Sequence, residues 1–175
     1  MRMQIKGHTI INAPAADVWG VIAHQFAAIG EWASSIPTSY AAPEVTPPVG
    51  AAVGARVCAT GVRGFQDVRE QFISYDEEAM RFAYQATAGL PWIVRRAENH
   101  WRVSSLDESH CRVEAQAVVD LRTVPGLLLA PLLSLQMNRL GRQTCEELKY
   151  YVENGRPHPR KAGSAGAARE VVQRS

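Results

Sequence analysis

The feature that most constrains the fold of this chain is a run of strands joined by short connections and followed by one long helix. Apolar and polar side chains alternate along residues 67–75, 80–87, 95–104 and 111–121. Such short connections predict an antiparallel meander. After Gly126 the apolar residues recur every three or four positions as far as Tyr151. This spacing predicts one amphipathic helix of about 25 residues.

The part of the chain before the meander predicts one further strand, two short helices and two weaker strands. The first strand covers residues 4–11 and ends before Pro14, and the short helices follow around residues 18–22 and 26–32. The weaker strands are expected at 38–45 and 55–60, with a turn at 61–64. Helices this short are not stable alone, so they must pack against the rest of the fold.

Together these elements predict an α+β fold: a curved antiparallel sheet of about six to seven strands, two short helices and a long C-terminal helix. A curved sheet covered by one helix cannot close its core completely, so an internal cavity is expected between them. Residues 1–154 are expected to form this single domain. Residues 155–175, rich in Gly, Pro and basic side chains, are expected to be a flexible tail.

Strand alternation predicts which side chains face the cavity, because every second residue of a strand points to the same side. In the strand 67–75 the apolar residues favour one face, although Ile73 and Tyr75 favour the opposite register. The small residues Ala115 and Ala117 on the last strand leave space unfilled. The predicted inward set is Val68, Glu70, Phe72, Phe82, Tyr84, Asn99 and Trp101.

Charge and composition limit the classes of partner. The net charge is +2, and residues 155–175 carry +4, which leaves −2 for the rest of the chain. A slightly acidic domain argues against a dedicated nucleic-acid surface. The longest apolar run, residues 124–135, is 12 residues long with two prolines, whereas a membrane span needs about 20. Three scattered cysteines without a C-x-x-C pair, and no secretory signal, favour a reducing cytoplasm.

Several short motifs resemble one known superfamily. They are Ile10-Ile-Asn-Ala-Pro-Ala-Ala-Asp-Val-Trp19, Glu31-Trp32, Gly54-Ala-Arg56, Val68-Arg-Glu70, Tyr75-Asp-Glu-Glu78 and Phe82-Ala-Tyr84. In this order they resemble the polyketide cyclase/dehydrase and START-like (Bet v 1-like, SRPBCC) superfamily over residues 3–154. The resemblance implies a helix-grip fold around a ligand cavity, with Arg56 and Glu70 inside it and Tyr84 and Arg95 nearer its mouth. It does not imply one activity, because this fold hosts enzymes, receptors and carriers.

Glu70 is the sharpest catalytic candidate. Burial in an apolar cavity raises the pKa of a carboxylic acid in general, which suits proton transfer at neutral pH. The competing interpretation is a structural ion pair with Arg56, because an unpaired buried charge is costly. Tyr84 and Arg95 are the other catalytic candidates.

The remaining candidates are expected to bind ligand rather than react with it. Arg56 and Arg95 can clamp a carboxylate or carbonyl-rich molecule, or else extend to solvent. The predicted ligand-binding set is Arg56, Val68, Phe72, Phe82, Asn99, Trp101, Leu132 and Gln136. No metal-binding, phosphate-binding or dinucleotide motif is present, so no metal and no cofactor are expected.

Three functions remain open from the sequence. The first is an enzyme, a cofactor-independent cyclase or dehydratase of the lyase or isomerase type, acting on a hydrophobic or polyketide-like molecule. The second is a non-catalytic carrier or sensor of a lipid, isoprenoid or quinone-like ligand. The third is an interaction module that uses the Leu-rich segment 126–135. Whether the protein forms a homodimer is left open.

Overall fold

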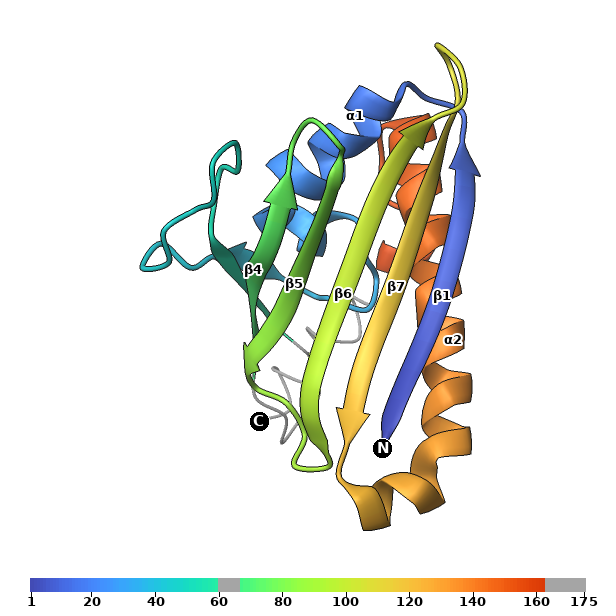
Figure 1. Ribbon diagram of the computed structural model, residues 1–175. Coiled ribbons are helices and arrows are strands. Elements are labelled where there is room, and N and C mark those ends of the chain that lie inside the picture. The colour runs from blue at the N-terminus through green and yellow to red at the C-terminus, as the bar shows by residue number, and fades with distance from the viewer. Residues whose placement is uncertain (60–66, 163–175) are drawn as a thin grey trace.

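The computed structural model describes residues 1–59 and 67–162, and for residues 123–130 it gives the course of the backbone only. The predicted α+β helix-grip fold is confirmed: one antiparallel sheet lies against the long helix α2 (Figure 1). The strands of this sheet follow the order β1-β7-β6-β5-β4-β3-β2. The elements are β1 (Arg2–Ile11), α1 (Ala15–Trp19), η1 (Gly20–His24), η2 (Phe26–Glu31), β2 (Ser39–Ala41), β3 (Ala55–Cys58), β4 (Val68–Asp76), β5 (Arg81–Ala88), β6 (Val94–Ser105), β7 (Cys111–Leu121) and α2 (Thr123–Asn154).

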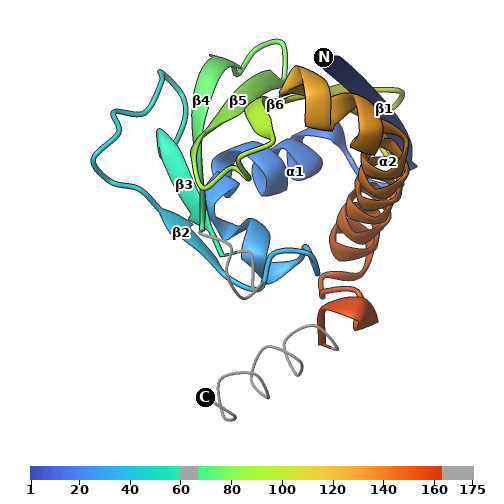
Figure 2. The ribbon, with the colours of Figure 1, turned by 90° about the horizontal axis from the view of Figure 1, so that it is seen from below.

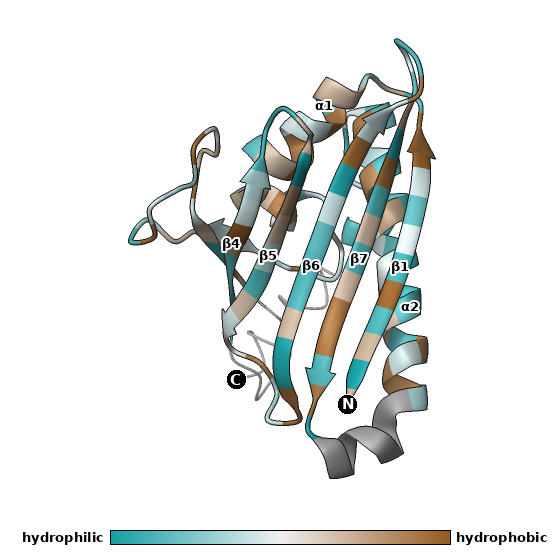
Figure 3. Ribbon diagram, viewed as in Figure 1, coloured by the Kyte–Doolittle hydropathy of each residue, from teal (hydrophilic) through white to brown (hydrophobic). Residues whose placement is uncertain are grey.

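Alternating polarity along the strands gives the sheet one buried face and one exposed face. Bands of hydrophobic and hydrophilic residues succeed one another along β6 and β7 (Figure 3). The sheet curves around α1 and the short helices η1 and η2, and α2 lies on the same side of the sheet, next to β1 (Figure 2). The short helices therefore pack inside the curve of the sheet, where their apolar side chains Val18, Trp19, Phe26 and Ile29 are buried.

A β-bulge in β4 resolves the ambiguous register of that strand. Phe72 pairs with Tyr84 and Ser74 pairs with Ala83, so Ile73 is an extra residue without a partner on β5. The extra residue resets the alternation. As a result Phe72 is buried and Tyr75 also packs against the core, while Ile73 is exposed. Both registers that the sequence suggested are therefore present, one on each side of the bulge.

Two predicted elements differ in length from the observed ones. The strand expected at 38–45 is only β2, because Pro43, Pro47 and Pro48 cannot donate hydrogen bonds to a neighbouring strand. Helix α2 has 32 residues and begins at Thr123, before the predicted start. Proline is tolerated at position 125, in the first turn, because the N–H groups of that turn have no hydrogen-bond partner within the helix.

The hydrophobic core consists of two clusters. The larger cluster joins the short helices to β4, β5 and β6, and it contains the rings of Trp19, Phe26, Phe82 and Trp101. The smaller cluster contains Met3, Ile5, Val119 and Leu121, with Leu133 and Met137 of α2 packed against it. Space that neither cluster fills lies between them.

The chain continues past the end of α2 in a described segment, residues 155–162. Gly155 ends the helix in the left-handed conformation, with φ of 64°, and its N–H group donates to the carbonyl of Tyr151 at 2.9 Å. Beyond it, Arg160 and Lys161 contact the domain. The predicted flexible tail is thus described only in its first part, and there it is bound. The predicted turn at 61–64 lies outside the described residues.

Candidate functional site

An internal cavity of about 300 Å³ lies between the sheet, α2 and the segment after η2. Most of its wall is apolar, and its polar groups come mainly from β3, β4, β5 and β6. The lining residues are Ile5, Gly7, Ile29, Ala33, Ser35, Ile36, Arg56, Glu70, Tyr84, Asn99, Trp101, Ala115, Ala117, Met137, Leu140, Gly141, Thr144 and Cys145. Ile29, Trp101 and Tyr84 belong to the larger core cluster, and Ile5, Ala117 and Met137 to the smaller one. The cavity therefore occupies the gap between the two clusters.

The polar residues of the cavity form a row across the sheet. Arg56 of β3 lies directly opposite Glu70 of β4, and Tyr84 of β5 lies directly opposite Asn99 of β6. The row continues on β7 with Ala117, which pairs with Asn99. The row is not level between β4 and β5, because Glu70 pairs with Ala86 and Tyr84 pairs with Phe72. The cavity wall is therefore polar on β3 to β6 and apolar on β7.

Arg56 is the most completely engaged charge in the site. Its side chain is 3% exposed, and its Nε donates to Glu70 Oε2 at 2.7 Å. One terminal nitrogen donates to the carbonyl of Phe26 at 2.7 Å, and the guanidinium lies 3.9 Å from the centre of the Phe26 ring. Burial by itself lowers the pKa of Arg56, but the neighbouring Glu70 more than offsets this and the pKa is raised overall. Arg56 is thus held by the protein as a fixed positive charge.

Glu70 has one carboxylate oxygen bound to the protein and one directed elsewhere. Oε2 accepts from Arg56, and the thiol of Cys58 donates to the same oxygen at 3.6 Å. Within residues 1–59 and 67–162, no hydrogen bond reaches Oε1. The side chain keeps 14% of its surface exposed and lines the cavity. Glu70 therefore forms an ion pair with Arg56 through Oε2. Its other oxygen, Oε1, remains able to accept a proton or a hydrogen bond from a bound molecule.

Tyr84 and Asn99 complete the row as neutral polar groups. Burial, followed by the charge of Glu70, raises the pKa of Tyr84, so its hydroxyl stays protonated near neutral pH and can donate. Asn99 is half-buried, and its amide can both donate and accept. These two side chains suit recognition of a carbonyl or hydroxyl group.

The structure brings five of the predicted site residues together at the cavity. They are Arg56, Glu70, Tyr84, Asn99 and Trp101. Phe72 and Phe82 instead pack in the larger core cluster, with ring centres 5.4 Å apart. Val68 is half-buried on β4 and does not line the cavity. Phe72 and Phe82 therefore point inward as expected, but they form part of the packed core and not of the cavity wall.

Three other predicted residues lie away from the cavity. Arg95 is exposed on β6, next to an irregularity in the pairing of β6 with β7 between Val94 and Arg96. Leu132 and Gln136 are exposed on α2. We therefore leave these three side chains out of the proposed site. The helix residues that do line the cavity are Met137, Leu140, Gly141, Thr144 and Cys145.

Some cavity residues carry no signal in the sequence that would have identified them. Ile29 lies in η2, and Ala33, Ser35 and Ile36 lie in the irregular segment that follows it. Neither a helical nor a strand periodicity applies to such residues, so their orientation depends on the tertiary fold alone.

A larger depression of about 760 Å³ lies open to solvent over β1, β5, β6 and β7. Its lining includes the exposed charged residues Lys6, Arg81, Arg102 and Glu114. Water competes for such groups, so an open, charged surface holds a small hydrophobic molecule less well than an enclosed apolar one. The internal cavity is the better candidate site despite its smaller volume.

The buried thiol of Cys58 leads to a prediction about alkaline pH. Burial raises the pKa of Cys58 from 9.0 to about 12, so the folded protein keeps a proton that the unfolded chain loses. The free energy of unfolding should therefore fall as the pH rises from 9 towards 12, by about 1.4 kcal/mol per pH unit for this thiol. Urea denaturation at several pH values measures the slope. Cys58→Ala should show a shallower slope, and an unchanged slope in that variant would contradict the assignment.

The fold and this site define a class of protein: a helix-grip ligand-binding domain whose mostly apolar cavity has polar groups on one wall. The sequence comparison agrees with this class. The chain belongs to the family described as polyketide cyclase / dehydrase and lipid transport, whose model matches residues 2–153. Family and fold together indicate binding of a hydrophobic small molecule. In the described part of the chain, no helix is long and apolar enough to cross a membrane.

Solved structures share the fold at low sequence identity. The Zhui aromatase/cyclase from Streptomyces sp. R1128 is 14% identical, with a TM-score of 0.69 over 87% of this chain and 94% of its own. A START superfamily protein from Mycobacterium smegmatis is 13% identical, with a TM-score of 0.67 over 86% and 97%. A point mutant of Thalictrum flavum norcoclaurine synthase, in complex with a transition-state analogue, is 17% identical, with a TM-score of 0.62 over 89% and 96%. No curated protein matches the sequence.

Proposed function

We propose that the protein binds a hydrophobic or polyketide-like molecule in the cavity and catalyses its cyclisation or dehydration. The observation that carries the proposal is the carboxylate of Glu70, whose oxygen Oε1 accepts no hydrogen bond from the described residues and which lines the same mostly apolar cavity as Tyr84. The family description and the names of two structural relatives, an aromatase/cyclase and a synthase, support an enzyme of this kind.

The arrangement suits chemistry at a carbon next to a carbonyl group. Glu70 Oε1 takes the proton from that carbon, and Tyr84 donates a hydrogen bond to the carbonyl oxygen, where negative charge develops. The carbanion carbon then forms a bond to a second carbonyl carbon of the same molecule, and the protonated Glu70 returns its proton to the new alkoxide. For dehydration, the carboxylate of Glu70 takes a second proton from the same carbon and delivers it to the hydroxyl, which leaves as water while the carbon–carbon double bond forms.

The apolar wall contributes by positioning. A flexible chain has to fold so that its two reacting carbons meet, and an enclosed cavity that excludes extended conformations favours this. Arg56 keeps the carboxylate of Glu70 in place through Oε2, so we assign it a positioning role. Arg95 has no role in this scheme.

Separate assays of binding and turnover on Glu70→Gln test the proposal. The substrate is a linear tetraketide thioester, and the product is a ring detected by liquid chromatography and mass spectrometry. Turnover should fall by about 100-fold or more, because glutamine cannot take the proton, while binding measured by fluorescence quenching changes little. The exposed Glu78→Gln serves as the matched control and should keep full activity.

A carrier or sensor function remains the alternative, because Glu70 is the one carboxylate that lines the cavity among the described residues. Wild-type protein that binds the thioester but forms no ring product would favour this alternative. Native mass spectrometry of freshly purified protein would then identify a co-purified molecule.

A further inference from the structure

The segment of residues 33–37, between η2 and β2, forms part of the cavity wall. Ala33, Ser35 and Ile36 line the cavity, opposite the C-terminal half of α2. The segment belongs to no strand, so no sheet pairing holds it. Its position depends on local turns, such as Ile36 N–H to the carbonyl of Ala33 at 3.2 Å, and on contacts from elsewhere in the chain.

One set of these contacts comes from Lys161, far along the chain. Its ammonium group donates to three carbonyl oxygens of the segment, those of Ala33 at 3.1 Å, Ile36 at 2.5 Å and Pro37 at 3.1 Å. An ammonium group has three N–H donors, and here three carbonyl oxygens of one short segment accept from it. Such an arrangement is specific. Lys161 therefore fixes the backbone of the segment at both of its ends.

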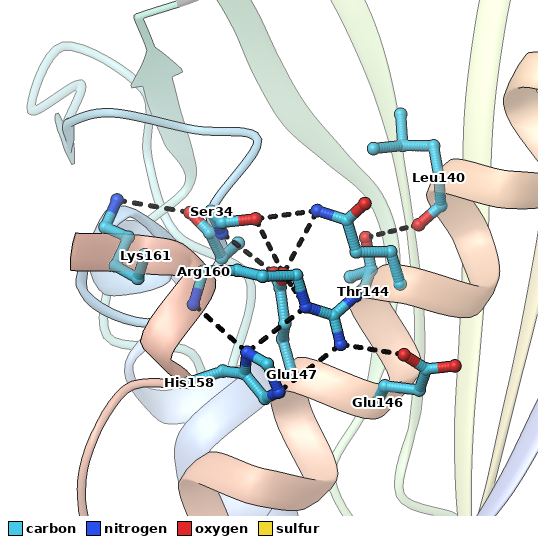
Figure 4. Close-up of polar contacts among 10 residues, drawn as sticks. Ser34, Leu140, Thr144, Glu146, Glu147, His158, Arg160 and Lys161 are labelled. Carbon is cyan, nitrogen blue, oxygen red and sulfur yellow. Dashed lines mark hydrogen bonds and ion pairs between the residues drawn. The ribbon is translucent and has the colours of Figure 1, made fainter. Parts of the chain in front are cut away.

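A second set comes from Glu147 of α2, whose polar contacts are drawn in Figure 4. Its side chain is fully buried. It accepts from the backbone N–H of Ser34 at 2.8 Å and from the Ser34 hydroxyl at 2.6 Å. Gln143 donates to the same carboxylate at 3.1 Å. Arg160, the residue before Lys161, places its Nε 3.6 Å from Glu147. The carboxylate thus connects segment 33–37 to the end of the chain.

The backbone geometry explains how the chain end reaches this place. Gly155 adopts the left-handed conformation and ends α2, so the chain turns and residues 158–162 lie beside the helix (Figure 2). Arg160 then bonds Glu146 at 2.8 Å on the helix surface. This contact directs the following residue, Lys161, to the carbonyls of the segment.

We propose that residues 158–162 act as a latch that holds segment 33–37 against α2, with Lys161 and Glu147 as positioning residues, and so limits the rate at which a ligand enters and leaves the cavity. The proposal rests on ligand binding in the cavity and on no catalytic step. The latch consists of a few side-chain contacts, so its release does not require unfolding of the sheet. Local opening of this kind occurs where few backbone hydrogen bonds hold a segment.

Two measurements on Lys161→Met test the latch. The first is hydrogen exchange of the amides of residues 33–37, followed by mass spectrometry. The second is the exit rate of 2-naphthol, a two-ring probe with one hydroxyl, measured by stopped-flow fluorescence. Both rates should rise by about tenfold or more, as the loss of several hydrogen bonds to a charged group implies. Exchange in β6 and β7 should not change.

Matched variants separate the latch from a general effect on stability. Arg156→Met removes an exposed positive charge from the same chain end and should leave both rates unchanged. Lys161→Arg retains a cationic donor and should restore slow exchange in large part. Glu147→Gln keeps an oxygen acceptor for Ser34 but not the charge that faces Arg160, and it should give intermediate rates.

The outcomes distinguish this inference from the proposed function. Wild-type exchange rates at residues 33–37 in Lys161→Met would overturn the latch, and so would an equal acceleration throughout the sheet. If the wild-type protein fails to bind 2-naphthol, the proposed cavity function loses its support. The exchange measurement still decides in that case whether Lys161 holds the wall.

Discussion

Replacing Arg56 by methionine should lower the free energy of unfolding by about 3–5 kcal/mol, the usual cost of breaking a buried ion pair. The variant leaves Glu70 without its charged partner and the carbonyl of Phe26 without its donor. It also removes the guanidinium that lies against the rings of Phe26 and Tyr84. Chemical denaturation followed by circular dichroism measures the loss.

The control for this prediction is Arg102→Met. Arg102 is exposed on β6, so its replacement should change stability by no more than about 0.5 kcal/mol. The double variant Arg56→Met/Glu70→Leu should recover much of the stability, because no unpaired charge remains in the core. A loss below about 1 kcal/mol for Arg56→Met would show that water reaches the pair and that the site is not enclosed.

Replacing Ala117 by phenylalanine should lower the affinity for 2-naphthol by about 100-fold or more, equivalent to about 2.7 kcal/mol. Ala117 lies at the apolar end of the polar row, and a larger side chain there extends into the cavity. The protein should stay folded, because the added ring occupies space that is empty between the two core clusters. Isothermal titration calorimetry gives the affinity, and the melting temperature reports on folding.

Ala52→Phe is the matched control, since it adds the same side chain at an exposed loop position. It should bind 2-naphthol as the wild type does. Full binding by a folded Ala117→Phe variant would place the probe outside the cavity, and the open depression over β1, β5, β6 and β7 would become the next candidate.

The sequence predicts the polar row of the site because that row depends on regular strand geometry. Alternation predicts that Glu70, Tyr84 and Asn99 face inward, although Ile73 and Tyr75 favour the opposite register for the strand of Glu70, and the family resemblance adds Arg56. Alternation fails for Arg95, where an irregularity in the pairing of β6 with β7 interrupts the regular pattern. Strand irregularities of this kind are set by tertiary contacts, so a single sequence does not show them.

For helix α2 the sequence predicts the spacing of the inward-facing residues, but not every residue that faces the cavity. The spacing of Leu133, Met137 and Thr144 predicts the buried stripe of α2, and the structure confirms that these residues face the sheet or the cavity. Leu132 and Gln136 each precede a member of that stripe by one position, and a step of one residue rotates a side chain by about 100° around the axis. An error of one residue in the assignment of the inward-facing positions therefore removes a helix residue from the predicted site.

The latch residues could not have been predicted from the sequence. Glu147 and Lys161 look like ordinary surface charges of a helix and a basic tail. Their partners are mostly backbone groups of residues 33–37, and a backbone group leaves no trace in residue identity. Contacts of this type appear only when the path of the chain is known.

The separation of the hydrophobic interior into two independent packing units affects how this protein can change over evolution. Side chains at the boundary between the units, such as Ala115, Ala117 and Gly141, determine the size and shape of the chamber. Ala115 packs against the larger unit and Ala117 against the smaller one, and both are only partly buried. Substitutions at the boundary can therefore reshape the chamber for a different guest, while the residues that maintain the architecture stay the same.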